Sequence, residues 1–376
     1  MSRALVLTGG GARAAYQVGV LKGIASILPR SVYNPFPIIC GTSAGAINAL
    51  SIAGRAGPFR LRTKKLETIW HNLRASDIYR TDFWGVSANA FHVMASFLHS
   101  GYGIGRPISL LDNTPLRQLL ESYVKFDYLD NAITNGELEA IAISAMSYSS
   151  GQSVTFFQGR EQISPWRRAR RRGEKTEINI DHLMASTAIP SLFPAVQIGN
   201  RYYGDGAVRQ LKPISPALHM GARQLLIIGV SDNATTDTGE TVADHSPSIA
   251  QIVGHMFNSA FIDSVESDLE TLRSINRLAS ALPESLRTNN GITDLNPVDV
   301  LSISPSQSID QIAQEHIHEL PTSLKLFLRV TGANAQGGGT SAASYLLFEP
   351  GFCRKLIELG FQDAMTQRED IEKFFH

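Results

Sequence analysis

The apolar positions near the start of the chain fall into two short runs, each followed by a turn containing glycine and then by a helical pattern. Residues 4–7 form the first run and predict a buried strand, and residues 14–28 predict the helix that follows it. Residues 36–40 form the second run, and residues 44–53 predict a second helix. Two strand–loop–helix units in tandem are typical of a parallel sheet with helices on its faces.

Short apolar runs and amphipathic stretches continue along the rest of the chain. Further strands are predicted at 139–147, 153–157, 196–203 (as a hairpin), 224–230 and 298–303. Helices are predicted at 64–73, 114–123, 181–194, 249–278, 320–330 and 345–365. We therefore expect a three-layer α/β/α fold with a mostly parallel central sheet. Residues 1–230 would form the core, and residues 231–376 a helical C-terminal extension packed on it, with the strand near 298–303 joining the sheet.

Three further segments carry no clear strand or helix pattern, and two of them fit more than one structural role. Residues 83–105 contain no Lys, Arg, Asp or Glu and are rich in aromatic residues, which suits either a lid or a buried core helix. The basic run at 167–172 suits either a solvated loop or a patch that meets anionic lipid head groups. Residues 337–339 are glycines with no strand before them, which indicates a linker.

Composition limits the partners and the compartment. Hydrophobic residues make up 43% and charged residues 18% of the 376, and the net charge of zero gives no overall field for nucleic acid. The two cysteines, Cys40 and Cys353, form no disulfide framework, which favours a reducing compartment. The opening apolar run is too short for a signal peptide, and no run approaches the ~20 residues that span a bilayer. We therefore expect a cytoplasmic protein that contacts membrane surfaces transiently.

The strongest chemical signal is Gly41-Thr42-Ser43-Ala44-Gly45, directly after the second apolar run. Gly-x-Ser-x-Gly at a strand-to-helix turn is typical of a nucleophile elbow, which holds a serine hydroxyl at the end of a sheet. The two glycines allow the strand and the helix to approach each other closely. An ordinary tight turn with a capping serine is the alternative explanation of these five residues.

Acyl transfer through a serine requires donors for the oxyanion and a base for the hydroxyl. Candidate donors are the amides of Gly9, Gly10 and Gly11, in the loop after the first strand, and the amide of Ala44. Glycine suits this role because it lets the backbone approach a ligand closely.

The base has more than one candidate. Asp205 lies between two glycines at the end of a predicted strand, although an Asp-Gly pair is also a common turn. Of the ten histidines, His219 and His245 are the nearest candidates for a third member of a Ser-His-Asp triad.

Three motifs occur in order along the chain: Gly-Gly-Gly-x-Arg at 9–13, Gly-x-Ser-x-Gly at 41–45 and Asp-Gly-Ala at 205–207. Together they resemble the patatin-like phospholipase family, over roughly residues 4–230. The resemblance implies a dyad of Ser43 and Asp205 without histidine, and an oxyanion site at the three glycines with Arg13 close by. It also implies hydrolysis of fatty-acyl esters of phospholipids or lysophospholipids, with no metal or other cofactor. We expect Arg13 to hold head-group phosphate.

The resemblance leaves two questions about the site. The family motif usually has Gly after the Arg, where this chain has Ala14, and we expect a tighter helix start with an intact site. A carboxyl with the ordinary pKa of ~3.9 is a weak base for a hydroxyl. Desolvation would raise the pKa of Asp205 and the basic N-terminal region would lower it, so the sequence leaves the balance open.

Other functions fit parts of the same sequence. Gly9-x-Gly11-x-x-Ala14 satisfies the relaxed dinucleotide-binding fingerprint, but no acidic residue that could hold a ribose occurs before Glu67. A Ser-His-Asp hydrolase would use a histidine after Asp205. A non-catalytic lipid-binding protein could share the fold. The sequence predicts no oligomeric state.

Overall fold

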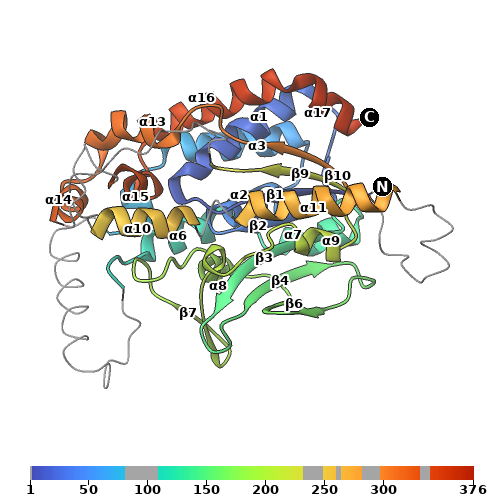
Figure 1. The fold of residues 1–376 in the computed structure, drawn as a ribbon, viewed down its shortest axis with the longest axis horizontal. Helices are drawn as coiled ribbons and strands as arrows, with labels where there is room; N and C mark the ends of the chain where they lie inside the picture. The colour runs from blue at the N-terminus through green and yellow to red at the C-terminus, as the bar shows by residue number, and fades with distance from the viewer. Residues whose placement is uncertain (1, 81–108, 232–248, 260–263, 282–296, 331–338) are drawn as a thin grey trace.

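The computed structural model describes residues 2–80, 109–231, 249–259, 264–281, 297–330 and 339–376. Its strands are β1 (Arg3–Leu7), β2 (Ile38–Thr42), β3 (Ala140–Ser147), β4 (Ser153–Gly159), β5 (Trp166–Arg168), β6 (Arg171–Lys175), β7 (Val196–Ile198), β8 (Arg201–Asp205), β9 (Gln224–Ile228) and β10 (Asp299–Ile303). Within the described residues they form one ten-stranded sheet in the order β10–β9–β1–β2–β3–β4–β6–β5 (Figure 1). β8 pairs with β3, and β7 pairs with β8.

The strands from β10 to β3 run parallel to one another. Parallel strands in such a sheet are covered by helices on both faces, so side chains pointing either way must be apolar. In β1, Leu5 and Leu7 belong to one apolar core, and Ala4 and Val6 belong to the other. This two-sided burial explains why the apolar runs of the sequence are continuous.

Helices form a layer on each face of the sheet. The layer that shares a core with Leu5 and Leu7 contains α1 (Ala15–Ile27), α2 (Ala44–Ala53), α3 (Phe59–Asn72) and α16 (Pro350–Thr366). The layer that shares a core with Ala4 and Val6 contains α9 (Ser215–His219) and α11 (Ser264–Ala281). The predicted three-layer α/β/α fold with a helical C-terminal region is confirmed (Figure 1).

The remaining helices are mostly short. They are η1 (Gly11–Ala14), α4 (Ala75–Ile78), α6 (Thr114–Tyr123), α7 (Asp127–Thr134), α8 (Ile180–Ser186), η2 (Gly206–Val208), α10 (Ile249–Asn258), α13 (Ile309–His316), η4 (Ile317–Glu319), α14 (Thr322–Val330), α15 (Gly339–Leu346) and α17 (Arg368–Phe375). Among the helices of the described ranges, none has both the length and the apolar character needed to cross a bilayer.

The basic run at 167–172 is part of an antiparallel hairpin formed by β5 and β6, so it is not a loop, although residues 167–170 are exposed to solvent as the first alternative expected. β6 pairs with β4 and thereby extends the sheet. Trp166 anchors the hairpin, because its ring stacks on Phe157 of β4 with the ring centroids 4.9 Å apart. Arg167 and Arg168 are exposed in β5, because a long charged side chain can keep its charged end in water while its stem follows the sheet. The high charge density of the run therefore did not indicate strands.

Several predicted boundaries in the C-terminal region are also corrected. The single helix expected at 249–278 is described as α10 and α11, with residues 260–263 outside the described ranges. The helix expected at 345–365 is divided between α15 and α16, because the backbone is extended at Glu349 and a proline starts the next helix. Gly339 begins α15 and is not part of a linker. The segment 83–105 lies outside the described residues, as does most of the glycine-rich stretch before Gly339.

α1 and α16 pack backbone to backbone through glycines. A Cβ atom at Gly19 would lie 2.1 Å from the carbonyl oxygen of Ile357, and one at Gly360 would lie 2.2 Å from the carbonyl oxygen of Tyr16. Neither position has room for a larger residue without displacing a helix. A helix from the far end of the chain therefore covers the helix that follows the glycine loop.

Candidate active site

Ser43 occupies a strained turn between β2 and α2. Its φ of 55° and ψ of −130° are uncommon for a residue other than glycine. Glycines on both sides make the turn possible: a Cβ at Gly41 would lie 2.5 Å from the Cα of Ala46, and one at Gly45 would lie 2.4 Å from the carbonyl oxygen of Leu7. The predicted elbow is thus present as a turn that only small flanking residues permit.

The register of β3 explains why Asp205 reaches the elbow. β2 pairs with β3 in parallel up to Thr42, which lies beside Ser144. β8 pairs with the next part of β3 in the antiparallel direction, and Asp205 lies beside Ala145. β8 therefore continues along β3 from the point where β2 ends. The Oγ of Ser43 donates a hydrogen bond to Oδ2 of Asp205 at 2.5 Å.

The environment of Asp205 favours its protonated form. The side chain is fully buried, and its Oδ1 accepts a hydrogen bond from the amide of Ala207 at 2.9 Å. Burial raises the pKa of Asp205 from 3.8 to about 7, because a charged carboxylate loses its hydration, although the hydrogen bonds from Ser43 and Ala207 oppose this shift. Desolvation therefore outweighs the other effects, and the carboxylate is a stronger base than a free Asp.

Ser186 fixes the backbone of the elbow, and the sequence analysis missed it. Its Oγ accepts a hydrogen bond from the amide of Ser43 at 2.9 Å and donates one to the carbonyl oxygen of Ser144 at 2.7 Å. The hydroxyl thus ties the residue after β2 to β3. Ser186 ends α8 in an unremarkable Ala-Ser-Thr context, and no spacing in the sequence links it to Ser43.

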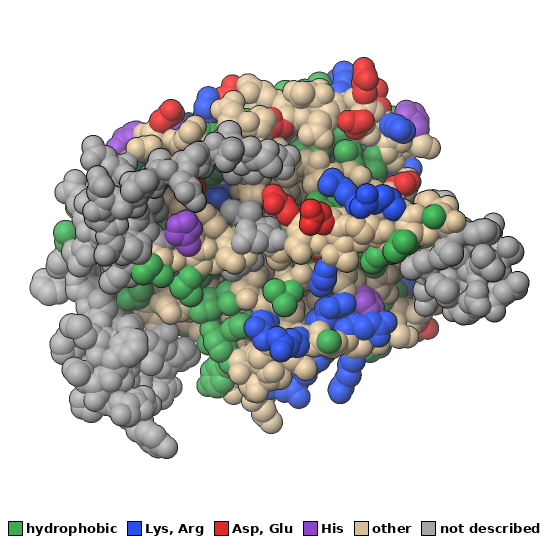
Figure 2. Space-filling model, in the orientation of Figure 1, with side chains coloured by type: hydrophobic (Ala, Val, Ile, Leu, Met, Phe, Trp, Pro, Cys, Tyr) green, Lys and Arg blue, Asp and Glu red, His purple; other side chains and the backbone are tan. Residues whose placement is uncertain are grey.

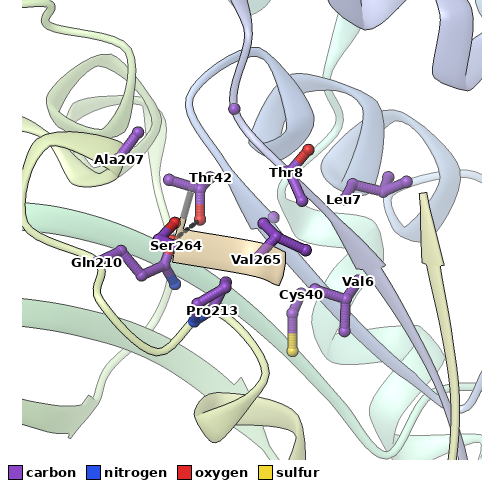
Figure 3. A pocket seen from close by; sticks show the side chains of 12 residues that line it. Val6, Leu7, Thr8, Cys40, Thr42, Ala207, Gln210, Pro213, Ser264 and Val265 are labelled. Carbon is purple, nitrogen blue, oxygen red and sulfur yellow. Dashed lines mark hydrogen bonds between the residues drawn. The ribbon is translucent and has the colours of Figure 1, made fainter. Parts of the chain in front are cut away.

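Gln210 supports the elbow from the other side and was also missed. It forms a hydrogen bond with the hydroxyl of Thr42, shown in Figure 3, and its Nε2 donates to Oγ of Ser144 at 2.8 Å. A small cavity of about 10 Å³ lies beside this pair. Residues of β1, β2 and α11 line the cavity, together with Gly9 and Ala207 (Figure 3). This volume is close to the ~10–15 Å³ that one water requires.

The glycine loop lies next to the elbow, because Leu7 pairs with Gly41 and the loop follows directly. Within the described residues, the amides of Gly9, Gly10 and Gly11 donate no hydrogen bond, and neither does the amide of Ala44 at the start of α2. A Cβ at Gly10 would lie 2.4 Å from Val230, and Gly11 has a φ of 55°. The four candidate oxyanion donors thus lie in two adjoining segments, with their hydrogen-bonding capacity unused.

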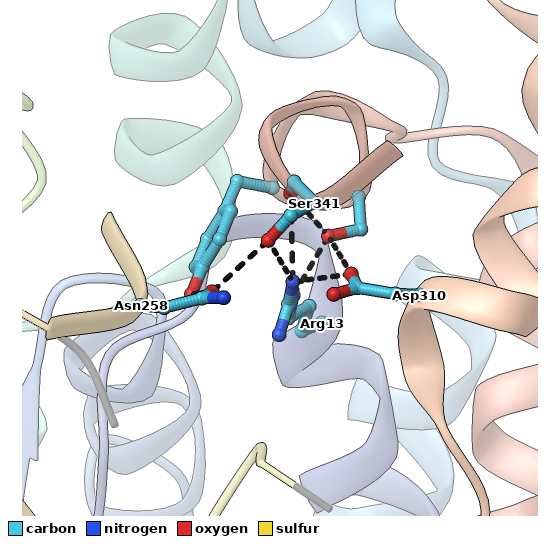
Figure 4. Close-up of polar contacts among 6 residues, drawn as sticks. Arg13, Asn258, Asp310 and Ser341 are labelled. Carbon is cyan, nitrogen blue, oxygen red and sulfur yellow. Dashed lines mark hydrogen bonds and ion pairs between the residues drawn. The ribbon is translucent and has the colours of Figure 1, made fainter. Parts of the chain in front are cut away.

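Arg13 has partners in the C-terminal region in place of the expected head-group contact. Its side chain is buried, its Nε donates to Ser344 at 2.8 Å, and its guanidinium pairs with Asp310 at 2.6 Å. Figure 4 shows it among Ser341, Asp310 and Asn258. The guanidinium also lies over the ring of Tyr345, 4.2 Å from its centroid. We therefore assign Arg13 a structural role and do not propose it as a ligand for lipid.

Ala14, where the family motif has Gly, ends the short helix η1 directly before α1. Its side chain is fully buried, and its carbonyl oxygen accepts a hydrogen bond from Asn48 at 3.1 Å. The methyl group is therefore accommodated in a tight helix start.

The structure describes one of the two candidate histidines, His219. His219 stacks on Trp166 with the ring centroids 4.9 Å apart, and its Nδ1 lies 2.8 Å from the carbonyl oxygen of Ser215. Among the described hydrogen bonds, none joins His219 to Ser43 or Asp205. His245 lies outside the described residues.

Comparisons with known proteins identify the family. The model of the family "Patatin-like phospholipase" matches residues 5–218, more than half of the chain. A cGAMP-activated phospholipase of Pseudomonas aeruginosa (strain BWHPSA011 / Pa011) is 40% identical over 58 residues, 15% of this chain and 17% of that protein. A cUMP-AMP-activated phospholipase of Escherichia coli is 49% identical over 51 residues, 14% of this chain and 16% of that protein.

These two matches are local, because each covers less than a fifth of the relative's length. The crystal structure of VipD from Legionella pneumophila aligns with 98% of this chain and 67% of its own, with a TM-score of 0.38 and 11% identity. A similarity at that level carries no argument about the site. The family match, by contrast, spans the glycine loop, the elbow and the Asp-Gly-Ala turn. This chain belongs to the patatin-like phospholipase family.

Proposed function

We propose that this protein is a serine lipid acyl hydrolase that cleaves fatty-acyl esters of phospholipids or lysophospholipids through a dyad of Ser43 and Asp205. The observation that carries the proposal is the 2.5 Å hydrogen bond from Ser43 to a buried carboxylate whose pKa is raised to about 7. A base is most effective when its pKa is near the working pH, and a serine needs an adjacent base to become a nucleophile.

In the proposed mechanism, Asp205 takes the proton of the Ser43 hydroxyl as Oγ attacks the ester carbonyl. The C–O bond to the leaving alcohol then breaks, and Asp205 returns the proton to that alcohol. Asp205 then takes a proton from a water molecule as the water attacks the acyl-serine, and gives that proton to Oγ of Ser43 as the C–Oγ bond breaks and the fatty acid leaves. Ser43, Asp205 and water account for each proton, so the cycle needs no third titrating residue.

The amides of Gly9, Gly10, Gly11 and Ala44 are the proposed donors to the oxyanion. Their lack of a hydrogen-bond partner within the described residues supports this role, because an amide aimed at developing charge must be free in the resting enzyme. The amide of Ser43 is not among the donors, since it binds Ser186. Loss of one such donor typically raises the activation free energy by ~3 kcal/mol.

Family membership supports a lipid ester as the substrate, and phospholipase A or lysophospholipase as the type of reaction. We further propose that the enzyme acts at a membrane surface that it contacts transiently. We propose residues 1–230 as the catalytic core and residues 231–376 as a region packed on it.

Release of fatty acid from a panel of defined phospholipids and lysophospholipids tests the proposal. Wild type should release fatty acid, and Ser43→Ala and Asp205→Asn should each reduce the rate by about a thousandfold or more. Covalent labelling by a fluorophosphonate should occur at Ser43 in wild type and be absent in Ser43→Ala. Because two relatives are named for activation by cGAMP and cUMP-AMP, each assay is run with and without these nucleotides. Full activity of Asp205→Asn would contradict the dyad, and failure to label Ser43 would favour a non-catalytic lipid-binding protein.

A further inference from the structure

A second cavity, of about 70 Å³, lies beside the β5–β6 hairpin and the segment that follows η2. We call it the basic pocket and define it by Thr155, Arg170, Arg171, Arg209, Lys212 and Ser215, which are among its lining residues. Figure 2 shows Lys and Arg side chains gathered on this face of the molecule, over β4 and β6 of Figure 1. The cavity is several times larger than the space that one water needs.

The charges that line the basic pocket are not balanced. Among the described residues that line it, none is Asp or Glu. Within the described part of the chain, Arg170, Arg171 and Arg209 form no ion pair with a carboxylate, whereas Lys212 pairs with Asp268 at 3.1 Å. Arg209 donates from Nε to the carbonyl oxygen of Gly151 at 2.9 Å, which leaves its positive charge uncompensated.

The guanidinium group of Arg171 has unused donor capacity. The Nε of Arg171 is buried and has no hydrogen-bond partner among the described residues. A buried donor without a partner lowers the stability of the fold, and a bound anion would supply the missing acceptor. Thr155 and Ser215 also line the pocket, and their hydroxyls lie 3.1 Å from Oγ of Ser144 and 3.3 Å from Nδ1 of His219. His219, which contacts Ser215, has its pKa lowered by burial, and the positive charges of Arg168 and Arg171 lower it further.

We propose that the basic pocket binds an anion bearing a phosphate group. Arginine guanidinium groups match the geometry and charge of phosphate oxygens. A carboxylate would fit the charge but would use fewer of the donors, because it has two oxygens where phosphate presents three or four. The phosphate belongs either to a soluble phosphate ester or to a lipid head group. This binding does not rest on the proposed hydrolysis at Ser43.

Titration of inorganic phosphate into the full chain by calorimetry tests the site without relying on catalysis. Wild type should bind phosphate saturably, at one site per chain. The double variant Arg170→Gln/Arg171→Gln should bind at least about tenfold more weakly, as expected when charged hydrogen bonds are lost. The matched control is Arg167→Gln/Arg168→Gln, which removes the same charge from the same hairpin at residues that do not line the pocket, and it should bind within about twofold of wild type.

Two further arms identify the source of the phosphate. Phosphatidylcholine vesicles containing phosphatidylglycerol are tested for binding to the same proteins, in parallel with soluble glycerol phosphate. Vesicle binding that is lost only in the pocket variant, and that phosphate inhibits, indicates a head group; binding of glycerol phosphate alone indicates a soluble ester. If the double variant does not fold, Arg209→Gln provides the same test at a lining residue outside the hairpin. The proposal is wrong if wild type shows no saturable binding of phosphate, or if the control weakens binding as much as the pocket variant.

Discussion

At the scale of single residues, the burial of Asp205 decides the chemistry. In water its carboxyl would be ionised at neutral pH and would attract a serine proton only weakly. Here burial raises its pKa to about 7, so the group can exchange a proton with Ser43 near neutral pH. The same burial means that ionisation of Asp205 lowers the free energy of unfolding. Two predictions follow from this single pKa, one for activity and one for stability.

The activity should depend on deprotonated Asp205. We expect kcat/KM for a soluble short-chain ester to rise with pH and to level off above a midpoint near pH 7, because only the charged carboxylate can accept the Ser43 proton. The measurement is a pH–rate profile, with ionic strength held constant. A midpoint near pH 4, as for an exposed Asp, would contradict the assignment of Asp205 as the base.

Asp205 should also make the fold less stable as the pH rises. Its pKa is higher in the folded protein than the usual 3.8, so between about pH 4 and pH 7 the folded state binds the proton more tightly than the unfolded state does. The free energy of unfolding should therefore fall across this range. Asp205→Asn removes the titration, and it should be more stable than wild type at pH 8 by up to about 4 kcal/mol, with a smaller difference at pH 4. Urea unfolding at both pH values measures this.

The control for that experiment is Asp299→Asn, which changes an exposed carboxylate in β10. It should shift stability by less than about 0.5 kcal/mol at either pH. A variant Asp205→Asn that is equally destabilised at pH 4 and pH 8 would show that the carboxylate has a structural role independent of its charge.

At the scale of elements, the site depends on the succession of β2 and β8 along β3. β2 ends beside Ser144, and β8 brings Asp205 to the next position. Ser186, at the end of α8, joins the amide of Ser43 to the carbonyl of Ser144 and so fixes the elbow relative to β3. The distance from Ser43 to Asp205 is therefore set by three elements that are far apart in the sequence.

Ser186→Ala tests this positioning role. The change leaves the amide of Ser43 and the carbonyl of Ser144 without their hydroxyl partner, and we expect kcat to fall about tenfold with little change in KM. Ser51→Ala is the control, because Ser51 is also a buried serine in a helix, and its described hydrogen bond is to the carbonyl oxygen of Ile47 in that same helix. Equal kinetic effects of the two substitutions, or a change confined to KM, would exclude a positioning role for Ser186.

At the scale of the whole molecule, the C-terminal region packs against the glycine loop at residues 9–11 and against the residues that follow it. Arg13, two residues after the last glycine of the loop, binds Asp310 and Ser344, and Gly11 packs against the carbonyl of Tyr345. α16 covers α1 through the contacts of Gly19 and Gly360. The C-terminal region thus supports the loop that carries the proposed oxyanion donors.

Arg13→Gln should destabilise the whole molecule. The substitution removes the ion pair with Asp310 and the hydrogen bond to Ser344. Because the Asp310 side chain is 34% exposed, we expect the free energy of unfolding to fall by about 2–3 kcal/mol, less than for a fully buried pair. Arg368→Gln is the control, because its pair with Glu372, one turn along the same helix, is on the surface and should contribute less than about 1 kcal/mol. Denaturant unfolding compares the two. A loss as small as that of the control would mean that Arg13 does not hold the two ends together.

The sequence by itself determined the elements that local patterns encode. The continuous apolar runs of β1 and β9 predicted buried strands, and the tandem strand–loop–helix units predicted a parallel sheet. The glycines around Ser43 predicted a turn in which strand and helix approach closely. The Asp-Gly-Ala turn gave Asp205 as a candidate base. Each of these signals lies within a few residues of the chain, where spacing and residue type are sufficient evidence.

Only the tertiary structure decided how those elements act on one another. Ser186 and Gln210 hold the elbow through contacts across 143 and 168 residues of sequence, and no local pattern distinguishes them from other polar side chains. Arg13 follows the glycine motif, yet residues about 300 positions later in the sequence bind its guanidinium. The pKa of Asp205 likewise depends on burial by many segments. Burial and long-range pairing are properties of the packed molecule, which is why the sequence left them open.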